Sequence, residues 1–189
     1  MARFFLTLAF SLLVGCASVP PAALSPRDEV RNFSLDARFA LRATLPGQTA
    51  QSSGGRLSWT HRHDNDLIQV ANPLGYGVAE IDAKPTISRL RTADGKVRES
   101  ADPDALIEDV TGLRLPVARL PGWLLGRPST DARIETDSFG RPGKLHEAGW
   151  LVDYFYDDER VTSLPVRLTI SRPGEIEIKL RIEEWRETP

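Results

Sequence analysis

Strict alternation of apolar and polar residues dominates this chain and predicts β-strands with one buried face. The clearest run covers residues 33–45, and its apolar positions are Phe33, Leu35, Ala37, Phe39, Leu41, Ala43 and Leu45. A period of two sustained over this length is typical of a half-buried strand. Leu57 and Trp59 continue the apolar pattern after residues 46–55, whose Gly, Ser and Gln content predicts a hairpin region.

Further short strands are predicted on both sides of a central helical segment. Before that segment they cover residues 67–71, 76–81, 86–90 and 96–99, with Asp94-Gly95 as the turn between the last two. After it, Trp150, Val152, Tyr154 and Tyr156 share one strand face, and apolar residues alternate with polar ones over 164–171 and 176–183. Antiparallel strands that are polar on one face follow from this pattern.

Three short helices are predicted among the strands. Residues 26–32 begin with proline at the first helical position, residues 103–111 lie between a capping Asp102 and Gly112, and residues 116–125 are interrupted by Pro121. Helices within a meander must cover apolar surface. The predicted fold is therefore mostly β with short helices, a large antiparallel curved sheet that forms an unclosed β-barrel with a helical lid over an apolar cavity.

The N-terminus has the features of a lipoprotein signal. Arg3 precedes an apolar run from Phe4 to Val14, which is too short for a bilayer of about 30 Å. Leu13 to Cys16 resembles the bacterial lipobox. The alternative is an ordinary secretory signal, which has the same kind of apolar run, followed by an unrelated cysteine. The lipobox implies that Cys16 carries three acyl chains. An aspartate after the cysteine would favour retention in the inner membrane. Ala17 at that position therefore implies attachment to the outer membrane, facing the periplasm.

We therefore predict three parts of the chain. Residues 1–15 form the signal peptide, residues 16–26 form a lipidated N-terminus with a flexible Pro/Ala-rich tether, and residues 27–189 form the binding domain. A domain of this length is large enough to bury a core of its own.

Composition narrows the functional classes. The net charge of the 189 residues is −2, which predicts no nucleic-acid partner and no polybasic patch for anionic lipid. The single cysteine excludes a disulfide framework and a thiolate metal cluster. Apolar residues at 41% and charged residues at 26% fit a globular domain.

No arrangement of catalytic residues stands out. His61 and His63 are two residues apart on a predicted strand and could face one metal, but a solvent-facing strand end explains them more simply. The acidic run from Asp157 to Glu159 is typical of a solvated loop. The chain contains no nucleophile elbow, phosphate-binding glycine loop or zinc-protease motif. We expect a protein that is not an enzyme and has no metal or cofactor.

One connecting loop has an unusual apolar residue. Asn72, Pro73 and Gly75 predict a turn, which places Leu74 at or near its tip. The leucine could fold back onto the core, or it could be exposed and dip into a bilayer. One inserted leucine contributes only about 1.5–3 kcal/mol, which suits transient contact with a membrane and not anchoring.

An ordered set of short matches resembles the LolB family of outer-membrane lipoprotein receptors. The matches are Leu13 to Cys16, the strand around Phe39, Trp59, Asn72 to Gly75, Thr111-Gly112, Pro116, Trp123 to Gly126, Gly149-Trp150 with Val152 and Tyr154, Leu164-Pro165, and Ile182 to Trp185. Tyr76 and the Gly/Ser stretch at 51–55 depart from the family pattern.

The resemblance implies a function and a site. Members of the family accept lipoproteins from a soluble periplasmic carrier, LolA, and place them in the inner leaflet of the outer membrane, using a protruding loop with an exposed leucine. Leu74, with Pro73 and Gly75, matches that loop. The expected partners are a LolA-like carrier, lipoprotein acyl chains as cargo and the membrane, and the protein is expected to be a monomer.

The candidate residues for an acyl-chain cavity are large apolar side chains predicted to face inward. They are Phe39, Leu41, Trp59, Trp123, Trp150, Leu168 and Leu180. Plain core packing would explain each of them equally well. Two other functions also fit the pattern: a lipocalin-like lipoprotein that binds a small apolar ligand, and a structural or regulatory lipoprotein that binds a protein.

Overall fold

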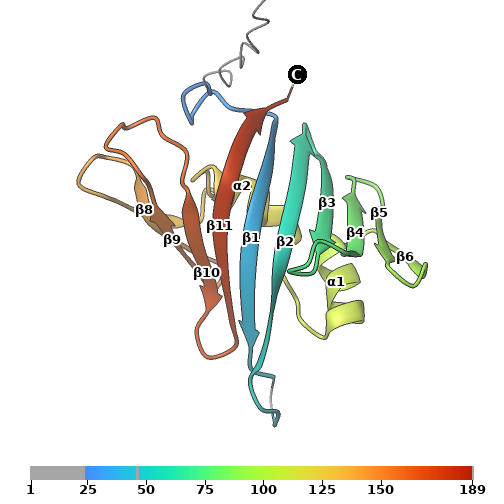
Figure 1. The fold of residues 1–189 in the computed structure, drawn as a ribbon. Coiled ribbons are helices and arrows are strands. Elements are labelled where there is room, and N and C mark those ends of the chain that lie inside the picture. The colour runs from blue at the N-terminus through green and yellow to red at the C-terminus, as the bar shows by residue number, and fades with distance from the viewer. Residues whose placement is uncertain (1–23, 46, 189) are drawn as a thin grey trace, which may run out of the picture.

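The computed structural model describes residues 24–45 and 47–188, and the predicted signal peptide and Cys16 lie outside them. Eleven antiparallel strands form one sheet, with the order β6-β5-β4-β3-β2-β1-β11-β10-β9-β8-β7 (Figure 1). The strands are β1 (Phe33–Ala43), β2 (Gln51–Arg62), β3 (Asn65–Ala71), β4 (Gly77–Ala83), β5 (Ser88–Thr92), β6 (Val97–Ser100), β7 (Arg133–Thr136), β8 (Pro142–Glu147), β9 (Trp150–Phe155), β10 (Arg167–Arg172) and β11 (Ile176–Glu187).

The sheet consists of two meanders. They are joined by the pairing of β1 with β11, the first and last strands of the domain. The first runs outward from β1 to β6, and the second returns from β7 to β11, which pairs with β1 from Phe33↔Glu187 to Ala43↔Ile176. Strands β6 and β7 lie at opposite ends of the strand order and do not pair with each other, so the sheet is not closed. The predicted antiparallel, unclosed barrel is confirmed.

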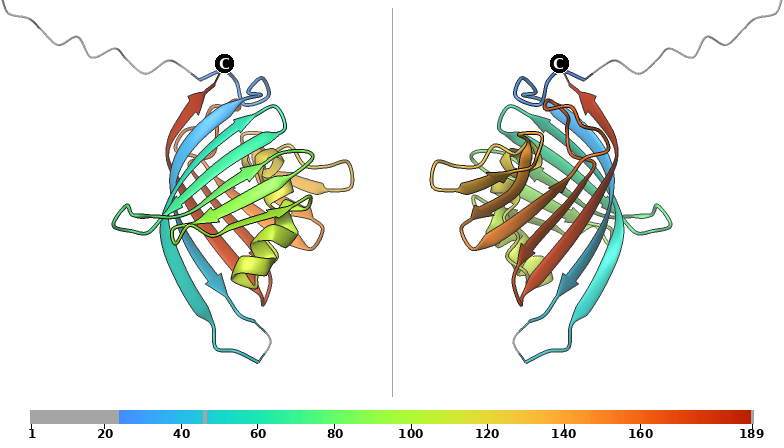
Figure 2. Two further views of the ribbon diagram at one scale, coloured as in Figure 1. Left: turned by 90° about the vertical axis from the view of Figure 1, so that its right-hand side faces the viewer. Right: turned by 90° about the vertical axis from the view of Figure 1, so that its left-hand side faces the viewer.

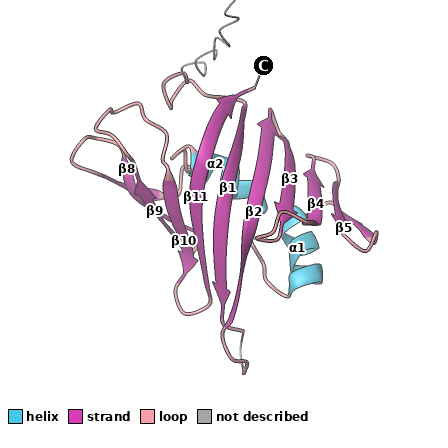
Figure 3. Ribbon diagram, in the orientation of Figure 1, coloured by secondary structure: helices cyan, strands magenta, loops and turns pink. Residues whose placement is uncertain are grey.

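The helical segment connects the two meanders and covers the concave face of the curved sheet (Figure 2). It comprises α1 (Pro103–Thr111), a single 3-10 turn η1 (Val117–Arg119) and α2 (Leu120–Leu124), seen beside the strands in Figure 3. Asp102 caps α1 by accepting hydrogen bonds from the backbone N–H groups of Asp104 and Ala105, and Gly112 ends it at φ 72°. Among the described residues, the helices are too short to cross a bilayer.

The core lies on the concave face, where the alternation places the apolar side chains. Phe33, Leu35 and Ala37 are almost fully buried, whereas Arg38 on the other face is exposed, as the period of two predicts. The buried apolar side chains extend from Val30 to Ile182. The domain after the predicted tether therefore has a hydrophobic core of its own.

Two local predictions were wrong, and a third was right only in part. Residues 26–32 contain a turn at 27–29 where a helix was predicted, because the chain must enter β1 directly. Residues 51–55 belong to β2, since Gly54 and Gly55 pair with Ala40 and Phe39 of β1. Residues 116–125 divide into η1 and α2.

Strands β7 and β8 were not predicted. Both are short, and β7 has one partly buried apolar residue, Ile134, among three exposed polar ones. Such a segment has too few alternating apolar positions to produce a recognisable period, and its pairing with β8 and β9 stabilises it instead.

Candidate functional site

The loop between β3 and β4, Asn72 to Tyr76, projects from the convex face of the sheet, on the side opposite the helices (Figure 2). A register shift between Val70 and Ala71 precedes it, so that Ala71 pairs with Gly77 across the loop. Bulges of this kind bend a strand and redirect the residues that follow.

Asn72 holds the loop in a defined shape. Its side-chain Oδ1 accepts hydrogen bonds from the backbone N–H groups of Leu74 and Tyr76, at 3.0 and 3.1 Å. The backbone N–H of Asn72 donates to the carbonyl of Tyr76 at 2.8 Å, and Gly75 adopts φ 91°, a conformation that favours glycine. The loop is therefore a compact turn organised by one side chain.

Leu74 is at the tip of this turn, and its side chain is 82% exposed. It does not fold back onto the core, so the structure decides between the two positions that the sequence left open. Tyr76 beside it is 70% exposed. Two large apolar groups at the tip of one protruding loop are unusual for a surface that only meets water.

The concave face carries the residues predicted to line a cavity. Trp59, Trp123, Trp150, Leu168 and Leu180 are all buried, with exposed fractions from 1% to 6%. The indole ring of Trp123 on α2 and that of Trp150 on β9 lie 6.1 Å apart between centroids. In this structure the helices and the sheet are packed against each other at these side chains.

Phe39 and Leu41 lie further along β1 and are only partly buried. Phe39 is opposite Gly55 of β2, and a Cβ atom at Gly55 would lie 3.2 Å from its ring. The concave face is therefore less completely covered toward the end of β1, where apolar side chains remain partly accessible.

A buried carboxylate attaches the helical segment to the sheet. Glu147 of β8 accepts hydrogen bonds from Trp123 Nε1 at 2.7 Å and Ser129 Oγ at 2.8 Å, and it pairs with Arg119. Burial opposes ionisation of this carboxyl, but the hydrogen bonds from Trp123, Ser129 and Arg119 outweigh it and lower the pKa of Glu147. The sequence pattern did not single out this residue.

The hydroxyl of Tyr154 forms a second polar contact with the same helix. It donates to the backbone carbonyl of Trp123 at 2.7 Å, which satisfies a carbonyl at the end of α2. Burial raises the pKa of Tyr154, so the hydroxyl remains a donor. Together, Glu147 and Tyr154 hold α2 to the sheet by specific hydrogen bonds.

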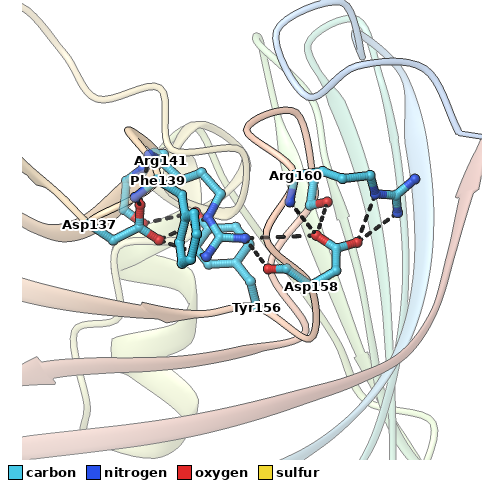
Figure 4. Close-up of polar contacts among 8 residues, drawn as sticks. Asp137, Phe139, Arg141, Tyr156, Asp158 and Arg160 are labelled. Carbon is cyan, nitrogen blue, oxygen red and sulfur yellow. Dashed lines mark hydrogen bonds and ion pairs between the residues drawn. The ribbon is translucent and has the colours of Figure 1, made fainter.

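A polar cluster ties the β7–β8 hairpin to the β9–β10 loop (Figure 4). The buried Arg141 donates to Asp137 at 2.8 Å and to the backbone carbonyl of Asp158, and its guanidinium lies 4.1 Å from the centroid of the Tyr156 ring. Asp158 also accepts from Ser163 and Arg160, which lower its pKa to about 2. The acidic run at 157–159 was predicted as a solvated loop, and the structure shows that Asp158 organises it.

His61 and His63 border the same surface hollow beside α2, but their contacts differ. His61 Nδ1 lies 2.8 Å from Asp66 Oδ1, which also accepts from Trp59 Nε1, and its ring packs on Phe33. His63 follows the end of β2 in a turn at φ 56°. Within residues 24–45 and 47–188, no three His, Cys, Asp or Glu side chains form a group suited to a metal ion.

Comparison with known proteins decides the family. Residues 31–185 match the family model described as outer membrane lipoprotein LolB. The chain belongs to the LolB family. A relative from Dechloromonas aromatica, named outer-membrane lipoprotein LolB, is 64% identical over 187 residues, which cover 99% of this chain and 98% of that protein. An Azoarcus relative of the same name is 36% identical, over 97% of this chain and 95% of its own.

Membership of the LolB family identifies the chain as an outer-membrane lipoprotein. Among solved structures, a LolA superfamily protein from Nitrosomonas europaea matches with a TM-score of 0.46 and 12% identity, covering 86% of this chain and 91% of that one.

Proposed function

We propose that this member of the LolB family accepts lipoproteins from a LolA-like periplasmic carrier, holds their acyl chains against the concave face of the sheet and inserts them into the inner leaflet of the outer membrane, without nucleotide. The observation that carries the proposal is the pairing of two features on opposite faces: a helix-covered apolar face, and a protruding loop with the 82% exposed Leu74.

The energetics of acyl chains require a receiving surface of this kind. Moving a chain into water costs about 0.8 kcal/mol for each CH₂ group, so a lipoprotein cannot cross the periplasm with its chains exposed. Direct transfer from one apolar site to another avoids that cost. The acceptor must bind the chains more tightly than the carrier does and less tightly than the bilayer does, and then transfer proceeds in one direction.

The acyl chains would enter where the concave face is least covered, beside Phe39 and Leu41. From there they would displace the helical segment and contact Trp59, Trp123, Trp150, Leu168 and Leu180. Hydrogen bonds from Trp123 and Tyr154 hold α2 in place, and individual contacts of this kind are weak enough to exchange for the burial of long apolar chains. The helices act in this proposal as a displaceable lid.

The loop would act at the delivery step. Leu74, held at the tip by Pro73, Gly75 and the side chain of Asn72, contacts the bilayer and brings the loaded domain to its surface. One leucine contributes about 1.5–3 kcal/mol, so the contact is reversible. The lipid on Cys16, which lies outside the described residues, would provide the permanent attachment of this monomeric receptor.

A two-step transfer assay tests the proposal. Carrier loaded with a radiolabelled lipoprotein is mixed with the domain from Ala17 to Pro189, and lipid vesicles are added afterwards. The wild type should take up the label and then release it to the vesicles. Leu74→Glu should take up the label and fail to release it. Val161→Glu, a substitution at a loop residue that is 56% exposed, is the matched control and should behave like the wild type.

For each step of the assay, one outcome would contradict the proposal. If no label moves to the wild-type domain, the receptor function is wrong, and a lipocalin-like protein for a small apolar ligand becomes the better hypothesis. If Leu74→Glu delivers as fast as Val161→Glu, the loop has no role in delivery. Photo-cross-linkers at Phe39 and Leu41 should capture the acyl chains during the first step.

A further inference from the structure

Four arginines form a straight row across the convex face of the sheet. Arg56 of β2 pairs with Arg38 of β1, Arg38 pairs with Arg181 of β11, and Arg181 pairs with Arg167 of β10. All four are exposed. Because neighbouring strands are about 4.8 Å apart, the row places four positive charges over about 14 Å. Composition predicted no basic patch, and the strand register creates one.

Such a row is unfavourable unless an anion binds to it. Like charges directly opposite each other on adjacent strands destabilise a sheet. Arg38 is paired with Glu183 at 2.6 Å, and the nearby Lys179 is paired with Glu177 at 3.1 Å. Within the described part of the chain, Arg56, Arg167 and Arg181 have no carboxylate partner. Three of the four charges are therefore available to an external anion.

The row is continuous with the protruding loop. Arg56 lies opposite Ala71, the last residue of β3 before Asn72. Arg56 and Gly75 line the same surface hollow of about 430 Å³, together with Val78 and Arg91. Glu80 in this hollow accepts a hydrogen bond from Gln69. The positive row thus begins at the base of the loop that carries Leu74.

An exposed aromatic ring lies at the other end of the row. Arg167 pairs with Phe155 of β9, and its guanidinium carbon is 5.3 Å from the centroid of that ring, which is 44% exposed. Cationic groups between exposed apolar and aromatic side chains match the interface of a bilayer, where phosphates lie above the acyl region. An acidic protein or a nucleic acid would not require an apolar tip such as Leu74.

We propose that the row of Arg56, Arg38, Arg181 and Arg167 binds the headgroup phosphates of anionic membrane phospholipids while the Leu74 loop is inserted. The row orients the convex face toward the bilayer, which leaves the helix-covered face directed away from the membrane toward an arriving carrier. This inference deepens the proposed delivery step and rests on it, since the loop and the row would contact the membrane together.

Vesicle binding without cargo tests the row separately from transfer. The domain from Ala17 to Pro189 is used because it contains the whole described core. Its binding would be measured by co-sedimentation with two kinds of vesicle. One kind is phosphatidylcholine alone, and the other is phosphatidylcholine and phosphatidylglycerol in equal amounts. The wild type should prefer the anionic vesicles, and added salt should weaken that preference. Replacing Arg56 and Arg181 together by Gln should lower the affinity for anionic vesicles about 30-fold, from roughly 1 kcal/mol for each charge.

The matched control removes the same charge from the helix side of the molecule. The control variant carries Arg98→Gln and Arg114→Gln. Arg98 pairs with Asp109, and Arg114 pairs with Asp102 and Glu108. This variant should bind the anionic vesicles almost as tightly as the wild type does. Circular dichroism should show that both double variants are folded.

Three results would overturn the proposal. The first is equal binding of the wild type to neutral and anionic vesicles, and the second is an equal loss in both double variants. The third is a variant at Arg56 and Arg181 that binds vesicles as tightly as the wild type does but binds an acidic carrier protein more weakly. That result would assign the row to a protein partner. The variant Leu74→Glu distinguishes the role of the loop from the role of the arginine row. It should lower binding to both kinds of vesicle, whereas neutralising the row should lower binding only to anionic vesicles.

Discussion

The indole Nε1 of Trp123 donates a 2.7 Å hydrogen bond to the carboxylate of Glu147, and this contact joins the short helix α2 to strand β8. Both side chains are buried, and the same carboxylate accepts from Ser129 and pairs with Arg119. A single acidic residue thus satisfies donors from three positions in the segment between α1 and β7. The attachment of α2 to β8 therefore involves this one carboxylate.

Glu147→Ala should destabilise the domain. It leaves the buried indole N–H of Trp123 without an acceptor and removes a charged partner from Arg119, which together cost about 2–3 kcal/mol in the free energy of unfolding. Urea denaturation would measure the change. Glu135→Ala, at an exposed carboxylate on β7, should change the free energy by less than about 0.5 kcal/mol. Equal effects of the two substitutions would contradict this role for Glu147.

Stability should decrease in acid partly because of Glu147. Its pKa is lower in the folded protein than the ordinary value of 4.5, so the ionised form stabilises the fold at higher pH. That contribution is complete above about pH 4.5 and is lost as the pH falls through the lowered pKa. Urea midpoints measured from neutral pH down to about pH 3 should decrease more for the wild type than for Glu147→Gln. Parallel curves would show that Glu147 does not contribute.

Gly55→Ala should disrupt the pairing of β2 with β3. A Cβ atom at this position would lie 2.0 Å from the backbone oxygen of Ala71, and relief requires movement of the strand that leads into the loop. Overpacking of this kind costs about 1–3 kcal/mol. Gly77→Ala is the control, because a Cβ atom there meets no atom within 4 Å. The thermal midpoint should fall for Gly55→Ala and change little for Gly77→Ala.

Asn72→Ala should impair delivery without impairing acceptance. The substitution removes the acceptor for the N–H groups of Leu74 and Tyr76, so the tip loses its fixed shape. Because these hydrogen bonds are exposed, the free energy of unfolding should change by about 1 kcal/mol or less. The label should still reach the domain from the carrier and pass more slowly to vesicles. Asn65→Ala, at the start of β3, should transfer normally, and a normal rate for Asn72→Ala would show that loop order is unimportant.

Local patterns in the sequence predicted the strand faces and one helix correctly. Phe33, Leu35 and Ala37 alternate with polar residues, and the period of two assigns them to the buried face whichever strands lie beside them. The helix at 103–111 was equally predictable, because Asp102 and Gly112 cap it through contacts within one turn. The exposure of Leu74 was decided only by the structure, since a turn can place its central residue toward solvent or toward the core.

The sequence by itself determined which residues of the long strands face the core and where the turn at Asp94-Gly95 lies, because these depend on neighbours in the sequence. Only the tertiary structure decided which residues lie opposite each other. Arg38 and Arg181 come from opposite ends of the domain, and they meet because β1 pairs with β11 in one register, shifted by a bulge after Asp36. Register is set by the packing of whole strand faces. For that reason the row of arginines, and the attachment of Trp123 to Glu147, emerged only when the sheet was assembled.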